Sequence, residues 1–178
     1  ITTTIYDPLN YAIETQLPPA PTARTIQRTY SARGELLRET DPNGNTTMHE
    51  YDALKRKLKN IRAAVNNQSA ISEYRYDRNS NLIESKDARG NSTLFEYDVL
   101  NRKTKQTDPA PLSYVQTWAY DLNDNVLSTK DRRQIETQFS YDKNNRLLST
   151  TRDSQLQETR FLDENGNVTR LTDANGNT

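Results

Sequence analysis

Tyr97-Asp98-Val99-Leu100-Asn101-Arg102 is the stretch that decides the fold, because related copies of it recur along the 178-residue chain. Tyr-Asp pairs recur in one register, and Tyr30-Ser31 and Leu162-Asp163 are degenerate copies of them. The pairs begin at Tyr6, Tyr30, Tyr51, Tyr76, Tyr97, Tyr120, Tyr141 and Leu162. Successive pairs lie about 21 to 25 residues apart, and a near-constant period of this size is typical of repeat proteins.

The repeated units come in two alternating forms. One form is Tyr76-Asp77-Arg78-Asn79-Ser80-Asn81-Leu82, which returns at residues 120–126 and 162–168. The other is the Tyr97 form, which returns at residues 51–57 and, with Tyr11 in place of Arg, at residues 6–11. A second signal, Asp-x-x-Gly-Asn, precedes the next Tyr by about ten residues, as at Asp41 and Asp87. A turn is therefore predicted about every ten or eleven residues.

The segments between these turns are five or six residues long, which is the commonest length of a β-strand. They alternate as strands do: Thr93, Phe95 and Tyr97 fall on one face of such a segment, and Thr137, Phe139 and Tyr141 on another. The glycines fall at two positions of the repeat. In other copies the position four residues after Tyr holds Asn or Asp, and in two copies Lys55 and Ser80. Gly, Asn and Asp best tolerate the positive φ of hairpin turns. The sequence predicts an all-β antiparallel meander of about fourteen strands, one hairpin per Tyr-Asp unit. We expect the Asp after each Tyr to accept hydrogen bonds from N–H groups two or three residues further on.

The composition limits the functions that such a chain can have. Only 32% of the residues are apolar, mean hydropathy is −1.03 and the formal net charge is zero. No apolar run is long enough to span a membrane, and a neutral chain is not a typical nucleic-acid binder. The chain has no Cys, which excludes disulfide frameworks and thiolate zinc sites. The sequence thus predicts an ordered structure without a thick apolar core.

The Tyr-Asp units, the Leu100-Asn101-Arg102 turn and the Asp-x-x-Gly-Asn turns resemble the YD repeats of the rearrangement hot spot (Rhs) family. Similar repeats occur in the B and C components of bacterial insecticidal toxin complexes, in wall-associated toxins of Gram-positive bacteria and in animal teneurins. The resemblance covers about residues 5–178 and implies a long β-sheet that spirals into a hollow shell. In the bacterial members that shell encloses a C-terminal toxin domain, and in teneurins it serves cell adhesion.

On this basis we expect residues 1–178 to be a fragment of one array of seven to eight units, with no second domain. The leading hypothesis is a non-catalytic wall segment of a bacterial, secreted shell that encloses a toxin or effector domain until delivery. Its expected partners are the remaining repeats and the enclosed domain, with a secretion-apparatus or toxin-complex partner as a further expectation. The second hypothesis is a surface-adhesion module whose outer face or loops bind carbohydrate or protein. Trp118 and the tyrosines could stack on sugars there, although their strand register favours packing. The third hypothesis is an enzyme built on an Asp pair. Open strand edges at the ends of the array predict end-to-end association of the isolated chain.

No catalytic, cofactor-binding or metal-binding residues are predicted. His49 is the only His and is expected on a strand face or beside a turn. Asp121 and Asp163 open Asp-x-Asn-x-Asn stretches like a calcium loop, but Arg132 and Ala174 stand where the twelfth-position Glu belongs. The self-cleaving relatives carry an Asp-Pro-x-Gly-Leu core, whereas the segment at Asp41 has Asn in place of Leu.

Two proline-containing segments complete the expectations from the sequence. Residues 108–112, beginning at Asp108, lack the Gly of the self-cleaving core, so no protease residues are carried over. Leu17-Pro18-Pro19-Ala20-Pro21 is predicted to be a stiff connection between two strands, with an SH3-like ligand as the alternative.

Overall fold

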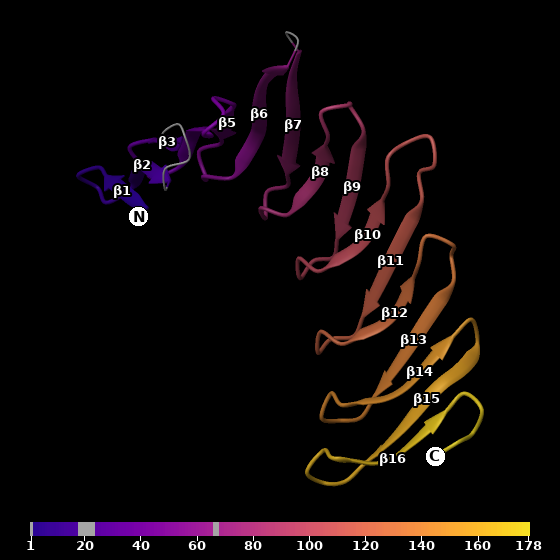
Figure 1. Ribbon diagram of the computed structural model, residues 1–178. Helices are drawn as coiled ribbons and strands as arrows, with labels where there is room; N and C mark the ends of the chain where they lie inside the picture. Colours follow the sequence, from indigo (N-terminus) through magenta and orange to yellow (C-terminus); the bar gives the residue numbers. More distant parts are fainter. Residues whose placement is uncertain (1, 18–23, 66–67) are drawn as a thin grey trace. The chain divides into compact units, whose positions relative to one another are not determined.

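The computed structural model describes residues 2–17, 24–65 and 68–178, and these ranges contain sixteen strands and no helix. The predicted fold class, an all-β antiparallel meander of hairpins, is confirmed (Figure 1). The predicted number of about fourteen strands is too low, because each of the eight Tyr-Asp units contributes a complete hairpin. No helical segment of the described ranges has the length and apolar character needed to cross a bilayer. The proline-rich stretch Pro18–Pro21 lies outside the described residues.

The chain divides into two compact units, the first ending at Ser92 and the second beginning at Thr93. In the first unit each strand pairs antiparallel with its neighbours in sequence. Its strands are β1 (Thr3–Tyr6), β2 (Ala12–Leu17), β3 (Arg24–Tyr30), β4 (Leu36–Thr40), β5 (Thr46–Tyr51), β6 (Lys57–Val65), β7 (Gln68–Tyr76) and β8 (Leu82–Lys86).

The second unit repeats the same pattern of consecutive antiparallel pairs. Its strands are β9 (Ser92–Tyr97), β10 (Lys103–Thr107), β11 (Val115–Tyr120), β12 (Val126–Lys130), β13 (Glu136–Tyr141), β14 (Leu147–Arg152), β15 (Gln155–Leu162) and β16 (Val168–Asp173).

Each Tyr-Asp hairpin has a β-bulge beside its turn. In the β11–β12 hairpin, for example, the register shifts between Ala119 and Tyr120, and Tyr120 then lies opposite Val126. The residue four positions after each Tyr has positive φ, from 61° to 70° where it is not Gly. A type I turn followed by a residue in the left-handed region is a common way to connect two strands. The prediction that glycines and their replacements mark positive-φ turn positions is confirmed.

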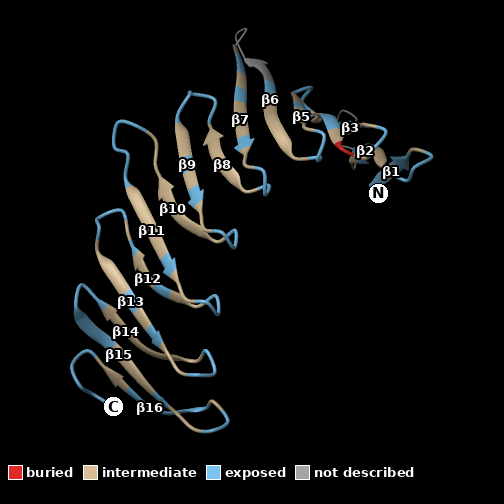
Figure 2. Ribbon diagram, turned by 180° about the vertical axis from the view of Figure 1, so that it is seen from behind, coloured by how far each residue is buried: buried red, intermediate tan, exposed pale blue. Residues whose placement is uncertain are grey.

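The sheet has no apolar core of the usual kind. Among the described residues no apolar side chain is buried, and Glu35, 9% exposed, is the one buried residue (Figure 2). Burial nevertheless alternates along the strands: Phe95 and Tyr97 are half-buried, whereas Leu94 before them and Glu96 between them are exposed. The predicted sharing of one face by Thr93, Phe95 and Tyr97 agrees with this alternation. Stability must therefore come from strand pairing, cross-strand contacts and the turns.

Candidate functional site

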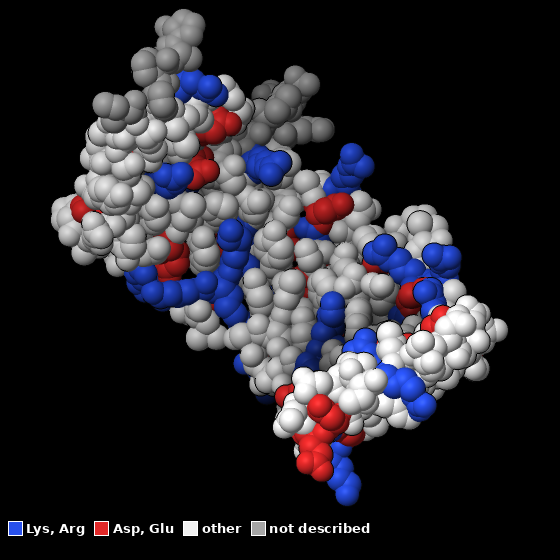
Figure 3. Space-filling model, turned by 60° about the horizontal axis from the view of Figure 1, so that its bottom comes forward, with Lys and Arg blue, Asp and Glu red and all other residues white. Residues whose placement is uncertain are grey.

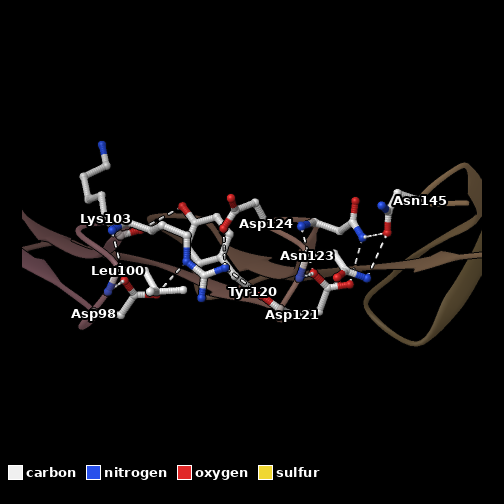
Figure 4. Close-up of polar contacts among 10 residues, drawn as sticks. Asp98, Leu100, Lys103, Tyr120, Asp121, Asn123, Asp124 and Asn145 are labelled. Atoms are coloured by element: carbon white, nitrogen blue, oxygen red, sulfur yellow. Dashed lines mark hydrogen bonds and ion pairs between the residues drawn. The ribbon is translucent and has the colours of Figure 1, made fainter. Parts of the chain in front are cut away.

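The edge of the sheet that carries the Tyr-Asp turns, here called the Tyr-Asp edge, holds the most regular set of side-chain contacts. Asp98 organises one such turn. Its N–H donates to the carbonyl of Arg102 at 2.9 Å, and its own carbonyl accepts from the N–H of Asn101 at 3.0 Å. The Oδ1 atom of Asp98 accepts from the N–H groups of Leu100 (2.9 Å) and Arg102 (3.0 Å), as Figure 4 shows in part.

This geometry corrects one expectation from the sequence. The turn aspartate accepts from N–H groups two and four residues further on, not two and three. The third N–H, that of Asn101, donates to the main-chain carbonyl of Asp98, the usual hydrogen bond of a four-residue β-turn. The same pattern recurs in turns at both edges of the sheet, for example at Asp77 and Asp87.

The side chain four residues after the Asp closes the turn, and it differs between the two repeat forms. In one form an Asn donates its Nδ2 amide to Asp Oδ2, as from Asn81 to Asp77 at 2.9 Å. In the other form an Arg donates its Nε, as from Arg102 to Asp98 at 2.7 Å. The hydrogen bond from Asn81, opposed by desolvation, lowers the pKa of the Asp77 carboxyl. Hydrogen bonds from the Arg102 main chain and side chain lower the pKa of Asp98 against a similar desolvation penalty.

The arginines of the second form, here called the bridging arginines, also reach the next turn along the edge. Nη1 of Arg102 donates to the carbonyl of Asp121 at 2.6 Å and lies 2.8 Å from Oδ1 of Asp124 (Figure 4). Its guanidinium lies 4.7 Å from the centre of the Tyr120 ring. Arg56 and Arg146 donate in the same way to the carbonyls of Asp77 and Asp163, each at 2.9 Å. Each bridging arginine thus joins two consecutive hairpins.

The repeated Tyr makes a second connection between hairpins. The hydroxyl of Tyr120, at the end of β11, donates to the carbonyl of Lys103, the first residue of β10, at 2.9 Å. Equivalent bonds, between 3.0 and 3.3 Å long, run from Tyr30 to Ala12, from Tyr51 to Leu36 and from Tyr141 to Val126. The main-chain pairing of β10 with β11 begins only at Lys105, opposite Thr117. The Tyr120 hydroxyl therefore joins the two strands at a point where their main chains are no longer paired.

Two turns of the first unit reach the same result with different residues. Tyr11 stands where a bridging arginine would, and its ring stacks on Tyr30 with centroids 5.0 Å apart. A Cβ atom on Gly34 would collide with the Tyr11 hydroxyl, so any larger residue there requires Tyr11 to move. In the degenerate turn at Ser31 the carboxylate has moved to Glu35, which accepts a hydrogen bond from the Ser31 hydroxyl and pairs with Arg33 at 2.9 Å. The Ser31 hydrogen bond lowers the pKa of Glu35.

His49 lies in β5, opposite Asn60 of β6, as the strand-face expectation had it. Desolvation, followed by the charge of Lys57, lowers the pKa of its imidazole. Asp121, considered above as a calcium ligand, has Oδ1 bonded to the N–H groups of Asn123 and Asn125. Within the described ranges no three acidic or histidine side chains are grouped so that they could hold a metal ion.

Trp118, the residue considered above for sugar stacking, lies in β11 and is half-buried. Nζ of Lys103 lies 4.4 Å from the centre of that ring and 5.8 Å from the centre of the Phe95 ring.

Basic and acidic side chains are intermingled on the face of the molecule shown in Figure 3. On the first unit Arg75 pairs with Glu84 at 2.7 Å.

The chain resembles one known protein family in sequence: the family model described as RHS Repeat matches residues 30–64 and 76–111. No curated protein sequence matches the chain.

Several solved structures share the fold. A crystal structure of TcdB2-TccC3 without its hypervariable C-terminal region has a TM-score of 0.74 at 16% identity over 96% of this chain and 11% of that chain. Another crystal structure of TcdB2-TccC3 has a TM-score of 0.70 at 14% identity, covering 97% of this chain and 12% of that one. The Photorhabdus luminescens Tc holotoxin pore has a TM-score of 0.66 at 19% identity, covering 89% and 10%. The chain therefore spans 10% to 12% of the longer chains that it matches, and at these identities the likeness is one of fold.

Proposed function

We propose that this chain, which belongs to the Rhs repeat family, is a non-catalytic wall segment of a β-shell that encloses a C-terminal toxin or effector domain until delivery. The observation that carries the proposal is the recurring set of contacts along the Tyr-Asp edge within each of the two units. Bridging arginines and tyrosine hydroxyls join consecutive hairpins there without any apolar core. The likeness to toxin-complex structures supports the same function.

A wall of this kind acts by exclusion. A single layer of strands separates an interior from solvent when every hairpin is fixed to the next, so that no gap opens between them. The bonds from Arg102 to Asp121 and from Tyr120 to Lys103 close the seam between two hairpins at the turn edge, where the ladder has ended. The intermingled charges give the wall no strong preference for a cargo of one sign.

The organisation and partners of the chain follow from this proposal. Residues 1–178 are one repeat array without a separate second domain, flanked by further repeats of the same protein. The partners are these repeats, the enclosed domain and a toxin-complex or secretion component. The protein is secreted or delivered into a target cell.

The proposal is tested on the full-length protein that contains this chain. Electron microscopy is expected to show a closed shell, and limited proteolysis should leave the C-terminal domain intact until the shell is opened by denaturant. Substitution of Arg56, Arg102 and Arg146 by Lys should make the enclosed domain accessible at lower denaturant concentration. An open sheet that displays its C-terminal domain to protease under native conditions would rule the proposal out, and glycan binding by the folded repeats would favour the adhesion alternative.

A further inference from the structure

Arg38 lies in the middle of β4 and has no carboxylate partner among the described residues. Among the same residues its side chain makes one bond, from Nη2 to the hydroxyl of Thr46 in β5, and that bond is long at 3.4 Å. Arg28, on the neighbouring strand β3, is instead paired with Glu39 at 2.7 Å. Most N–H groups of the exposed Arg38 guanidinium are therefore available to a ligand.

The pleat of the sheet explains why Glu39 does not pair with Arg38. Glu39 follows Arg38 directly in β4, and successive side chains of a strand point to opposite faces. The carboxylate of Glu39 therefore lies on the other face, where Arg28 stands opposite it in the register.

The acidic residues on the Arg38 face of β2 and β5 have other partners. Glu14 of β2 accepts a hydrogen bond from the amide of Gln16 at 3.0 Å. Glu50 of β5 is paired with Lys59 of β6 at 3.4 Å. In the described ranges the charge of Arg38 is thus left without a counter-charge.

Arg38 borders a small hollow of about 120 Å³, which is also lined by Gln27, Thr29 and Thr40. The register brings these residues together, because Thr29 lies opposite Arg38 and Gln27 lies opposite Thr40. The side chains of Gln27 and Thr29 bond to no other side chain in the described part of the chain. The hydroxyls of Thr40 and Thr46 share one hydrogen bond of 3.2 Å, so one of their two protons can still be donated.

This lining suits a small oxyanion. The hollow has room for roughly four water molecules and no carboxylate in its wall. A guanidinium offers paired N–H groups to the oxygens of phosphate, sulfate or a carboxylate. The hydroxyls of Thr29 and Thr40 and the amide of Gln27 add donors from other directions, which a tetrahedral anion can use and a planar carboxylate cannot.

We propose that this hollow binds a tetrahedral oxyanion, phosphate or sulfate, either free or as the end group of a larger molecule. Arg38 makes the charged contact, and Thr29, Thr40 and Gln27 donate to the remaining oxygens. The site belongs to one face of the first unit, so the inference goes beyond the proposed function and does not depend on it.

Equilibrium dialysis of the full-length protein against labelled inorganic phosphate at low ionic strength tests the proposal. Arg38→Gln should weaken phosphate binding at one site per chain by at least about tenfold, since it removes the charged donor. Thr29→Val keeps the branched side chain and should weaken the same site by about fivefold. Both positions are exposed, so circular dichroism should show an unchanged fold.

Arg75→Gln is the matched control, because it removes the same charge from a strand arginine that is already paired with Glu84. Phosphate binding should be unchanged in this variant. The absence of any phosphate site that is sensitive to Arg38→Gln overturns the proposal. Equal losses in Arg38→Gln and Arg75→Gln also overturn it, because they indicate only a general attraction of anions to basic side chains.

Competition with other anions identifies the ligand. Sulfate should displace labelled phosphate from the Arg38 site, whereas acetate should need at least about tenfold higher concentration, because it offers only one planar pair of oxygens. Acetate that competes as well as sulfate overturns the assignment to a tetrahedral anion. Phenyl phosphate that competes as well as inorganic phosphate supports the end group of a larger molecule as the ligand, and weaker competition supports the free ion.

Discussion

The guanidinium of Arg102 lies over the ring of Tyr120, 4.7 Å from its centre, while the hydroxyl of the same Tyr120 is bonded to the carbonyl of Lys103. Arg102 reaches forward from one turn to the next, and Tyr120 reaches back from the following hairpin. The two side chains therefore connect the same pair of hairpins in opposite directions. Arg56 lies over Tyr76 at 4.9 Å in the same manner.

Arg102→Lys should loosen the turn at Asp121 without unfolding the array. A lysine presents its donors from a single nitrogen, so it does not reproduce the fork in which Nε bonds to Asp98 and Nη1 bonds to the carbonyl of Asp121. Hydrogen exchange should speed up at the amides of residues 121–125 and stay unchanged in the first unit. Arg132→Lys is the control, since Arg132 is more exposed and pairs only with Asp108. Equal exchange rates at these amides in the two variants would mean that Arg102 does not stabilise the turn at Asp121.

Tyr120→Phe should lower the free energy of unfolding by about 1 kcal/mol, the usual net value of one hydrogen bond. The ring stays in place under Arg102, so the loss reports the hydroxyl alone. Denaturant titration followed by circular dichroism measures the change, with Tyr114→Phe as the matched control. A variant as stable as the unchanged protein would mean that the bond to Lys103 contributes nothing.

Two glycine substitutions separate backbone strain from crowding. Gly90→Ala should cost about 1–2 kcal/mol, because an L-residue is forced to a φ of 86° while its Cβ meets nothing closer than 4.0 Å. Gly34→Ala has the same φ but would also press against the Tyr11 hydroxyl. Its loss of unfolding free energy should therefore be clearly larger in the same titration. Similar losses would show that Tyr11 moves aside at no cost.

Acid should destabilise the whole array. Hydrogen bonds lower the pKa of turn carboxyls in the folded state, chiefly from the Asn91 amide at Asp87 and from the Asn125 amide at Asp121. Their unfolded pKa is about 3.9. The stabilisation they give is complete above that pH and is lost as the pH falls through it towards the lower folded values.

Thermal unfolding between pH 7 and pH 2 should show a steep fall in the midpoint below about pH 4. Asp77→Asn should reduce this pH dependence, because the replaced carboxyl no longer titrates. Asp153→Asn, in a turn between β14 and β15, is the comparison variant. If the unfolding midpoint did not change below pH 4, the ionised turn carboxylates would not contribute to the stability of the fold.

The sequence predicted the repeat, its turns and the alternation of the strands, because these depend on local backbone preferences. Positive φ at Asn101 and Gly90 can be expected from residue type alone. The bridging contacts of Arg102 could not be, since they join residues about twenty positions apart. The available signal was the Arg that stands four residues after Asp in one repeat form and is replaced by Asn in the other.

The degenerate turn shows a second limit of prediction. In the sequence, the turn at Ser31 differs from the other Tyr-Asp turns in that Ser replaces the aspartate. The structure shows that Glu35 supplies the carboxylate from the other end of the turn, with Ser31 as its donor. A compensating exchange of this kind depends on the contact between the two side chains, and neither residue indicates it when considered singly.

Each bridging arginine contacts the turn that follows it in the chain, and this limits how a gene encoding such an array can change in length. Arg56, Arg102 and Arg146 each need an Asn-type turn after them, so the inheritable module is a block of two hairpins. Tyr51, Tyr97 and Tyr141 mark its start, 46 and 44 residues apart. Duplication or deletion of a whole block preserves every bridge, whereas gain or loss of one hairpin places two turns of the same type side by side. Recombination among these arrays should therefore add or remove hairpins in pairs.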